Sequence, residues 1–174
     1  LRRTRIADEI EKADLVFDVG GVYDSANQRF DHHQHTYQGP LSSAGMVLEW
    51  LFKQSSIDES LRELLNSNIV RYVDDVDNGR IPPNPTLPCF ANIVDSLNHG
   101  CTTLDEFDAA FEKAADIAIL FIDGLVRKRD QQRQAEQIVM EAMKTAEKQK
   151  SNVIELPRYL PWKQIYFANG GAFH

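Results

Sequence analysis

Three consecutive residues, Asp31-His32-His33, place one carboxylate and two imidazoles side by side in the sequence. Neither a hydrophobic core nor a turn requires this composition, which therefore points to chemistry. Further acids stand before and after the triplet, at Asp18, Asp74 and Asp77. Carboxylates and imidazoles are ligands of hard and borderline divalent cations, so this set predicts a site for Mn²⁺, Mg²⁺ or Zn²⁺. Two such ions about 3.5–4 Å apart, bridged by an Asp, would activate a water for phosphoryl displacement.

Two short strands must position these residues. The apolar run 15–19 is followed by two glycines, a pattern typical of a buried strand in a parallel sheet, and Asp18 lies near its carboxyl end. A second short strand is expected at 29–31, immediately before the histidines. Open α/β sheets bind ligands at the carboxyl ends of their parallel strands. We therefore expect Asp18 and the histidines to meet at one edge of a parallel sheet.

Two helices are predicted after the histidines. Apolar residues at helical spacing mark the first over 44–52, and a pair of serines just before it can cap its start. The second spans 57–76 and opens on Ser56 and Glu59, which have the spacing of a capping box. Both helices carry one apolar face and are expected to pack on the core.

The second helix ends in three carboxylates, those of Asp74, Asp75 and Asp77. Acidic groups at a helix carboxyl end oppose the helix dipole, so either solvent or a metal ion must offset them. On a helical projection Asp75 lies within the apolar face, whereas Asp74 and Asp77 lie beside it. Periodicity alone therefore favours Asp75 as the acid that points inward.

The chain is predicted to have two portions joined by a linker. Residues 1–80 form the metal-binding domain, 81–102 form a proline-rich linker, and 103–174 form a helical and strand portion. The longest helical pattern lies in this last portion and opens on a second capping-box pair. Strands are expected after it, at 153–157 and 164–168.

The long helical pattern runs from Phe107 to Met143, and its capping-box pair is Thr103 and Glu106. It is the longest helical pattern of the chain, with an interruption near Gly124 as one option. Its middle, 127–133, has almost no apolar residue and is expected to be a solvated face.

Composition and charge limit the function. The chain has 19 Lys and Arg against 26 Asp and Glu, and its net charge of -7 argues against coating nucleic acid through a broad basic face. A small anionic substrate, or one strand end held by metal ions, fits this charge.

No apolar run approaches the roughly 20 residues of a membrane span. Two cysteines without C-x-x-C spacing indicate a reducing, intracellular compartment, and a weaker alternative metal site consists of Cys89, His99 and Cys101.

Longer strings around these residues resemble a known family. The triplet and the preceding Asp18 are similar to the signature of the DHH phosphoesterase superfamily. The strings 18–24, 29–34, 41–45 and 74–79, with Pro161-Trp162-Lys163, resemble its melanocyte-proliferating-gene branch, regarded as metal-dependent hydrolases. The resemblance implies an α/β fold: a DHH-phosphoesterase-like parallel sheet flanked by helices, then a long helix and a small α+β C-terminal portion.

The resemblance also implies an activity. The superfamily uses a dinuclear, usually manganese, site to hydrolyse phosphodiesters, and the eukaryotic members of this branch are regarded as 3'-to-5' RNA exonucleases. The expected partner is therefore RNA or a short oligonucleotide, with no membrane and with a homo-oligomer as one option. Two alternatives stay open: hydrolysis of a small phosphate or pyrophosphate compound, and a non-catalytic scaffold that retains the fold.

Site roles follow from the resemblance position by position. Asp18 would bridge the metals and His32 would be a metal ligand, while His33 would face the substrate phosphate and Asp31 would orient the histidines. Asp74 or Asp77 would complete one metal, because both match the family pattern whereas Asp75 does not. The residues expected to contact substrate are Arg29, Ser42, Ser43 and Asn78.

The sequence also departs from the family pattern. The family opens with a strand and loop whose histidines and acids supply the other half of the metal site, and no such residues precede Arg3 here. The loop between Gln34 and Leu41 is shorter than usual. The chain begins without Met, which is typical of a fragment. We therefore expect it to bind at most one metal tightly and to hydrolyse phosphodiesters poorly.

Overall fold

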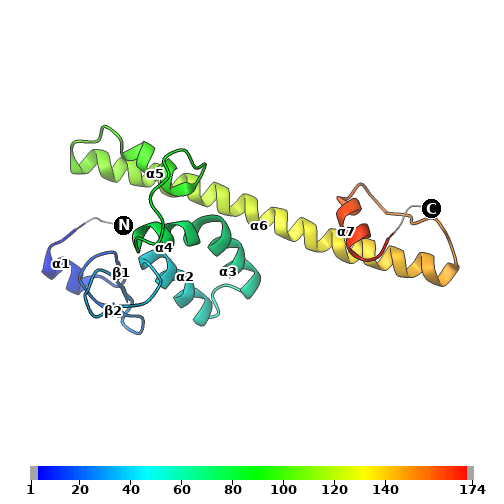
Figure 1. The fold of residues 1–174 in the computed structure, drawn as a ribbon, viewed down its shortest axis with the longest axis horizontal. Helices are drawn as coiled ribbons and strands as arrows, with labels where there is room; N and C mark the ends of the chain where they lie inside the picture. Colours follow the sequence, from blue (N-terminus) through cyan, green and yellow to red (C-terminus); the bar gives the residue numbers. More distant parts are fainter. Residues whose placement is uncertain (1–3, 172–174) are drawn as a thin grey trace. The chain divides into compact units, whose positions relative to one another are not determined.

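The computed structural model describes residues 4–171 of the 174 (Figure 1). The chain divides into two compact units, Leu1–Leu120 and Phe121–His174. In chain order the elements are α1 (Ala7–Lys12), β1 (Val16–Phe17), β2 (Tyr23–Asp24), β3 (Arg29–Phe30), α2 (Ser43–Lys53), α3 (Glu59–Leu65), the π-helical segment η1 (Asn66–Val70), α4 (Arg71–Asp77), α5 (Phe90–Asn98), α6 (Leu104–Gln149) and α7 (Trp162–Ala168). The described residues therefore form a mixed α/β structure that is mostly helical.

The sheet of the first unit is small and mixed. Its order is β1-β3-β2, with β1 parallel to β3 and β2 antiparallel to β3. The expected parallel sheet is thus not formed by the described strands, because the chain reverses between β1 and β2. Asp18, Gly20 and Gly21 all have positive φ in this reversal. Glycine adopts that conformation at little cost, so the two glycines permit the tight return.

The core of the first unit lies between the sheet and α2. Phe30 of β3 and Met46 of α2 are fully buried, and the Phe30 ring lies 5.6 Å from the ring of Trp50, centroid to centroid. Helix α2 also contacts α3, η1 and α4, and these helices lie together in Figure 1. The predicted helix over 44–52 is confirmed, and it holds the strand that leads into Asp31-His32-His33.

The predicted helix over 57–76 is also confirmed, as the continuous run α3–η1–α4. Its predicted capping box is wrong. Asp58 is the N-cap, and its side chain accepts a hydrogen bond of 2.6 Å from the backbone N–H of Leu61. The aspartate is directly before the first turn, where its carboxylate reaches the free N–H groups better than Ser56 can.

Helix α6 is continuous over 46 residues. Its predicted start is confirmed, because the Glu106 carboxylate accepts from the backbone N–H groups of Thr102 and Thr103 at 2.7 and 2.9 Å. The predicted interruption at Gly124 is wrong. One glycine costs only about 1 kcal/mol relative to alanine, and a long helix tolerates it.

The second unit contains no strand among its described residues, so both predicted strands there are wrong. Residues 164–168 belong to α7, whose Ile165 is buried with Leu160 against Ala135 and Val139 of α6. Trp162 and Tyr166 pack against the same cluster at helical spacing. Burial of one face against a helix therefore selects the helical conformation here. Across residues 4–171, no helix combines the length and apolarity needed to cross a bilayer.

Candidate metal centre

Asp18, His32 and His33 come together at one edge of the sheet. Their potential ligand atoms all lie within 4.8 Å of one another. Asp18 follows β1 and the histidines follow β3, and these two strands pair in parallel, so their carboxyl ends meet. The backbone N–H of Asp18 donates to the carbonyl of Phe30 at 3.0 Å, which extends this pairing to the start of the cluster.

Asp31 is a buried carboxylate that organises the first loop of the site. It is 2% exposed, and its Oδ2 accepts from the Gly21 N–H at 2.7 Å. Its Oδ1 accepts from the backbone N–H of His33 at 3.1 Å and lies 2.6 Å from Nδ1 of the same residue. Burial alone would raise the pKa of Asp31, but the hydrogen bonds from Gly21 and His33 outweigh it and lower the pKa overall.

His33 is the exposed partner of this pair. Its side chain is 58% exposed, and its hydrogen bond to Asp31 raises its pKa against the opposing effect of burial. The negative charges of Asp31, Asp18 and Asp77 raise the same pKa further. Because Nδ1 faces Asp31, Nε2 is the nitrogen left for a ligand or a substrate.

His32 connects the histidine loop to two helices. Its Nδ1 lies 3.4 Å from the hydroxyl of Ser43, the first residue of α2, and its Nε2 lies 3.6 Å from Oδ2 of Asp77, the last residue of α4. The His32 side chain is 6% exposed and that of Asp77 is 46% exposed. The His32 ring also lies against the ring of His33, with centroids 4.2 Å apart.

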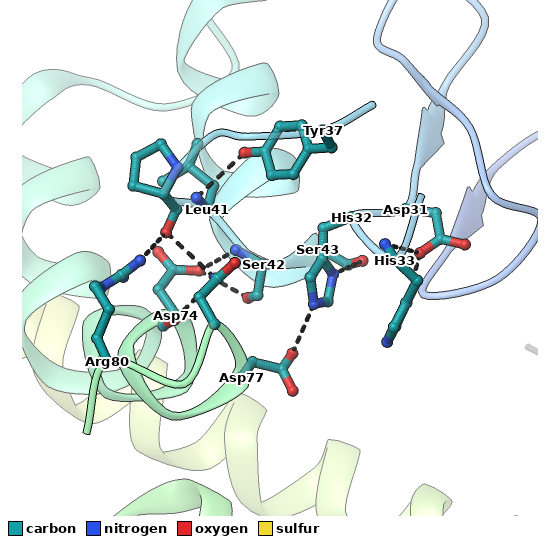
Figure 2. A network of polar contacts seen from close by, with 12 residues as sticks. Asp31, His32, His33, Tyr37, Leu41, Ser42, Ser43, Asp74, Asp77 and Arg80 are labelled. Carbon is teal, nitrogen blue, oxygen red and sulfur yellow. Dashed lines mark hydrogen bonds and ion pairs between the residues drawn. The ribbon is translucent and has the colours of Figure 1, made fainter. Parts of the chain in front are cut away.

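Asp74 and Asp77 of α4 face different partners, as Figure 2 shows. Oδ1 of Asp74 accepts from the backbone N–H of Ser42 at 2.8 Å and from its hydroxyl at 2.7 Å. Asp74 is 5% exposed and lies so close to α2 that a Cβ on Gly45 would be 2.5 Å from its Oδ2. Asp74 therefore anchors the start of α2, whereas Asp77 is directed at His32.

The chain matches a known protein family over most of its length. Residues 1–170 match the family MYG1_exonuc, described as Uncharacterised protein family (UPF0160). The chain belongs to this MYG1 exonuclease family. The match confirms the expected melanocyte-proliferating-gene family, and membership of the DHH phosphoesterase superfamily stays a prediction.

Several relatives of the MYG1 family are similar to the chain. A MYG1 protein of Chlamydia muridarum is 35% identical over 175 residues, which cover 99% of this chain and 58% of the relative. A MYG1 protein of Chlamydia pneumoniae is 36% identical over 172 residues, with the same coverage. The MYG1 exonuclease of Mus musculus is 33% identical over 101 residues, 44% of this chain and 27% of the relative. The chain thus spans 58% of the length of these chlamydial relatives, and no solved structure matches it.

The donor set in this MYG1 family member fits a divalent cation. It combines a carboxylate and two imidazoles within 4.8 Å, with a second carboxylate, Asp77, next to His32. Histidines that bind metals usually give their other ring nitrogen to a carboxylate or another hydrogen-bond acceptor, and His33 has this arrangement with Asp31. The alternative site at Cys89, His99 and Cys101 is not formed among the described residues.

The projection that favoured Asp75 is wrong. Asp74 is the buried acid, whereas the Asp75 side chain is 31% exposed and its Oδ1 accepts from Nε of Arg80 at 2.7 Å. The projection assumed a regular α-helix from 57 to 76, whereas η1 adds a wider turn before α4. The residues after η1 are therefore rotated about the helix axis, relative to their positions in the regular helix that the projection assumed.

Two expected substrate residues have partners within the protein. The Arg29 guanidinium donates to the backbone carbonyls of residues 11, 13, 14, 27 and 28. Asn78 donates through Nδ2 to the carbonyls of Pro40, at 3.3 Å, and Asp74, at 2.9 Å. Arg29 thus ties the end of α1 to the turn before β3, and Asn78 ties the end of α4 to the loop before α2. A role in substrate binding stays a prediction for both residues.

Sequence reasoning missed three residues that shape the site. Gly21 supplies an N–H to Asp31, Arg80 donates to the carbonyl of Pro40 at 2.7 Å, and the Tyr37 hydroxyl accepts from the Leu41 N–H at 3.2 Å. The Gly20-Gly21 pair is a sequence signal for a close backbone approach. The contacts of Arg80 and Tyr37 depend on tertiary structure and leave no local pattern.

Proposed function

We propose that this chain carries part of the active site of a metal-dependent phosphodiesterase of the DHH type. The observation that carries the proposal is the convergence of Asp18, His32 and His33 with Asp77 beside them. Family membership supports it, because relatives from mouse, rat and human are named MYG1 exonuclease. The proposed reaction is hydrolysis of RNA or a short oligonucleotide in the 3'-to-5' direction.

Asp18, His32 and Asp77 would hold the metal ion. Their mixture of carboxylate oxygen and imidazole nitrogen suits Mn²⁺, with Mg²⁺ and Zn²⁺ as the other candidates. Such an ion supplies Lewis acidity and lowers the pKa of water, which phosphodiester hydrolysis requires. Asp77 is the better candidate of the two acids in α4, because both hydrogen bonds of Asp74 Oδ1 go to Ser42.

His33 would contact the substrate phosphate. Its raised pKa favours the protonated imidazolium, which binds an anionic phosphate oxygen and can donate a proton. Asp31 would hold the ring in one orientation and one tautomer, since it occupies Nδ1 and leaves Nε2 for the phosphate. The proposed substrate contacts are Ser42, Ser43, Arg29 and Asn78.

A small phosphate or pyrophosphate compound is the second candidate substrate. The net charge of -7 favours it, because a long polyanion gains affinity from many basic contacts that an acidic chain offers poorly. A single strand end requires few such contacts, and the family name keeps the exonuclease as the leading proposal.

Hydrolysis of 5'-labelled single-stranded RNA in the presence of Mn²⁺ tests the proposal. Asp18→Asn and His32→Ala should abolish the stepwise shortening of the labelled strand, whereas His35→Ala, a change at an exposed histidine near the triplet, should leave it unchanged. Activity that survives Asp18→Asn and His32→Ala would locate the chemistry elsewhere. Hydrolysis of pyrophosphate but not RNA would favour the small substrate, and Mn²⁺ binding without hydrolysis of either would favour the scaffold.

A further inference from the structure

The helix that carries Asp74 and Asp77 contains a π-helical segment directly before them. In η1, Asn66–Val70, the backbone widens so that the Arg71 N–H donates to the carbonyl of Asn66, five residues back. A regular α-helix makes this bond to the residue four positions back. Short π segments within α-helices are rare and frequently occur at functional sites.

Two exposed side chains stabilise η1. A π turn offsets N–H groups from their usual acceptors, which leaves carbonyls at its start in need of a donor. The Ser67 hydroxyl donates to the carbonyl of Glu63 at 2.8 Å, and Nδ2 of Asn68 donates to the carbonyl of Leu64 at 2.8 Å. Nδ2 of Asn68 also donates to the Ser67 hydroxyl at 3.1 Å. The sequence thus supplies polar donors at the point where the wider turn needs them.

The extra residue of a π turn changes which acids face Ser42 and His32. It rotates every later residue by about 100° relative to an uninterrupted α-helix, since one residue corresponds to that rotation. Without this rotation Asp75 lies within the apolar face, and Asp74 and Asp77 point away from its centre. With the rotation Asp74 contacts Ser42, Asp77 lies beside His32, and Asp75 pairs with Arg80.

We propose that η1 sets the helical register of the metal centre, and that Ser67 and Asn68 are positioning residues for Asp77. The inference rests on the proposed function, because it takes Asp77 as a metal ligand. Neither Ser67 nor Asn68 approaches the cluster, and both act through the helix. Their removal favours a regular α-helix in which Asp77 no longer faces His32.

Mn²⁺ affinity of the chain, measured by calorimetry, tests this inference. The double variant Ser67→Ala/Asn68→Ala should bind Mn²⁺ about tenfold more weakly, the effect of losing two hydrogen bonds of ordinary net strength. Ser96→Ala is the matched control, because its hydroxyl donates to the carbonyl of Asn92 at 2.7 Å in the ordinary helix α5. This control should bind Mn²⁺ as tightly as the unmodified chain. Unfolding midpoints without metal confirm that every protein is folded at the measuring temperature.

A deletion and an insertion test the register itself. Deleting Asn68 converts the π turn into a regular α turn and leaves Asp77 in its present orientation, so Mn²⁺ binding should persist. Inserting one alanine between Arg71 and Tyr72 of the unmodified chain rotates Asp77 by about 100° and should remove Mn²⁺ binding. Unchanged Mn²⁺ affinity in Ser67→Ala/Asn68→Ala would overturn the inference, whether or not the deleted chain folds.

Asp77→Asn separates this inference from the proposed function. If Asp77→Asn weakens Mn²⁺ binding and the double variant does not, only the role of η1 is wrong. If Asp77→Asn leaves the affinity unchanged, Asp77 is not a ligand and this inference falls, whereas the proposed function still depends on Asp18 and His32. Weaker binding in Asp77→Asn and in the double variant, with unchanged binding in Ser96→Ala, is the result that we expect.

Discussion

Asp31 shows how one buried carboxylate can organise the residues around it. Three donors converge on it: the N–H groups of Gly21 and His33 and the ring of His33. They offset the cost of burying a charge and leave the carboxylate ionised, with a lowered pKa. The exposed ring of His33 is thereby held in one place, which preorganises it for a phosphate.

Asp31→Asn should slow RNA hydrolysis about 10–100-fold, the usual cost of losing the partner that orients a histidine at a metal site. The pKa of His33 should fall, because its hydrogen bond to Asp31 is the largest cause of its raised value. NMR titration of the His33 ring measures this directly. Asp24→Asn is the control, since the Asp24 carboxylate accepts from Ala26 and Asn27 within its own turn. An unchanged His33 pKa in Asp31→Asn would contradict the assignment.

The residue types of the site could be read from the sequence, but their partners could not. Asp31-His32-His33 and Asp18 stand out by composition, and their strands indicate a shared edge. Whether His32 meets Asp74 or Asp77 depends on a helix more than forty positions along the chain. Such contacts arise only from tertiary structure and leave no local periodicity.

At the scale of elements, α2 and α4 are joined by a buried polar contact. Oδ1 of Asp74 accepts two hydrogen bonds from Ser42, the residue just before α2. Free N–H groups and the helix dipole favour an anion at this end of a helix. Gly45 leaves the space that the Asp74 carboxylate occupies. This contact fixes α2 and therefore Ser43, whose hydroxyl lies beside His32.

Gly45→Ala should destabilise the protein by about 1–3 kcal/mol, because the new Cβ would displace the carboxylate and leave buried polar groups without partners. The same substitution at a helical glycine with open space around it should instead stabilise the protein. Gly124→Ala in α6, where a Cβ meets nothing within 4 Å, should stabilise by up to about 1 kcal/mol. Urea unfolding of both variants measures the difference, and equal effects at the two glycines would show that Asp74 is not tightly packed against α2.

The start of α6 should respond to acid. Hydrogen bonds from the backbone N–H groups of Thr102 and Thr103 lower the pKa of Glu106 from 4.5 to about 2. A lowered folded-state pKa means that the carboxylate stabilises the fold above pH 4.5 and loses this effect as the pH falls toward about 2. Glu106→Gln should therefore melt at a lower temperature than the parent chain at pH 7, and the difference in melting temperature should disappear at low pH. A difference in melting temperature that does not change with pH would rule out the charged cap.

The elements differ in how well the sequence predicts them. Helices 44–52 and 57–76 follow from their apolar periodicity, and the start of α6 follows from its capping box. Residues 164–168 are strand-like in composition, yet burial of Ile165 against α6 makes them a helix. The π turn of η1 leaves the apolar pattern almost intact, which is why a regular projection chose Asp75.

At the scale of the whole molecule, the chain has a net charge of -7 and gathers several of its carboxylates around His32 and His33. Asp18, Asp31 and Asp77 all raise the pKa of His33, which shows how closely their charges gather around the histidines. A divalent cation would neutralise this charge and, because it binds only the folded state, would stabilise the fold by mass action. Membership of the MYG1 exonuclease family is consistent with such a site, and the activity of the whole protein stays a proposal because the chain spans 58% of its chlamydial relatives.

Anomalous diffraction from crystals soaked in Mn²⁺ tests the central claim most directly. We predict one strong manganese peak within coordination distance of Asp18 and His32, on the side of Asp77, that disappears in crystals of His32→Ala. A manganese peak at Asp74 and Ser42 instead, or none near Asp18 and His32, would contradict the proposed metal centre.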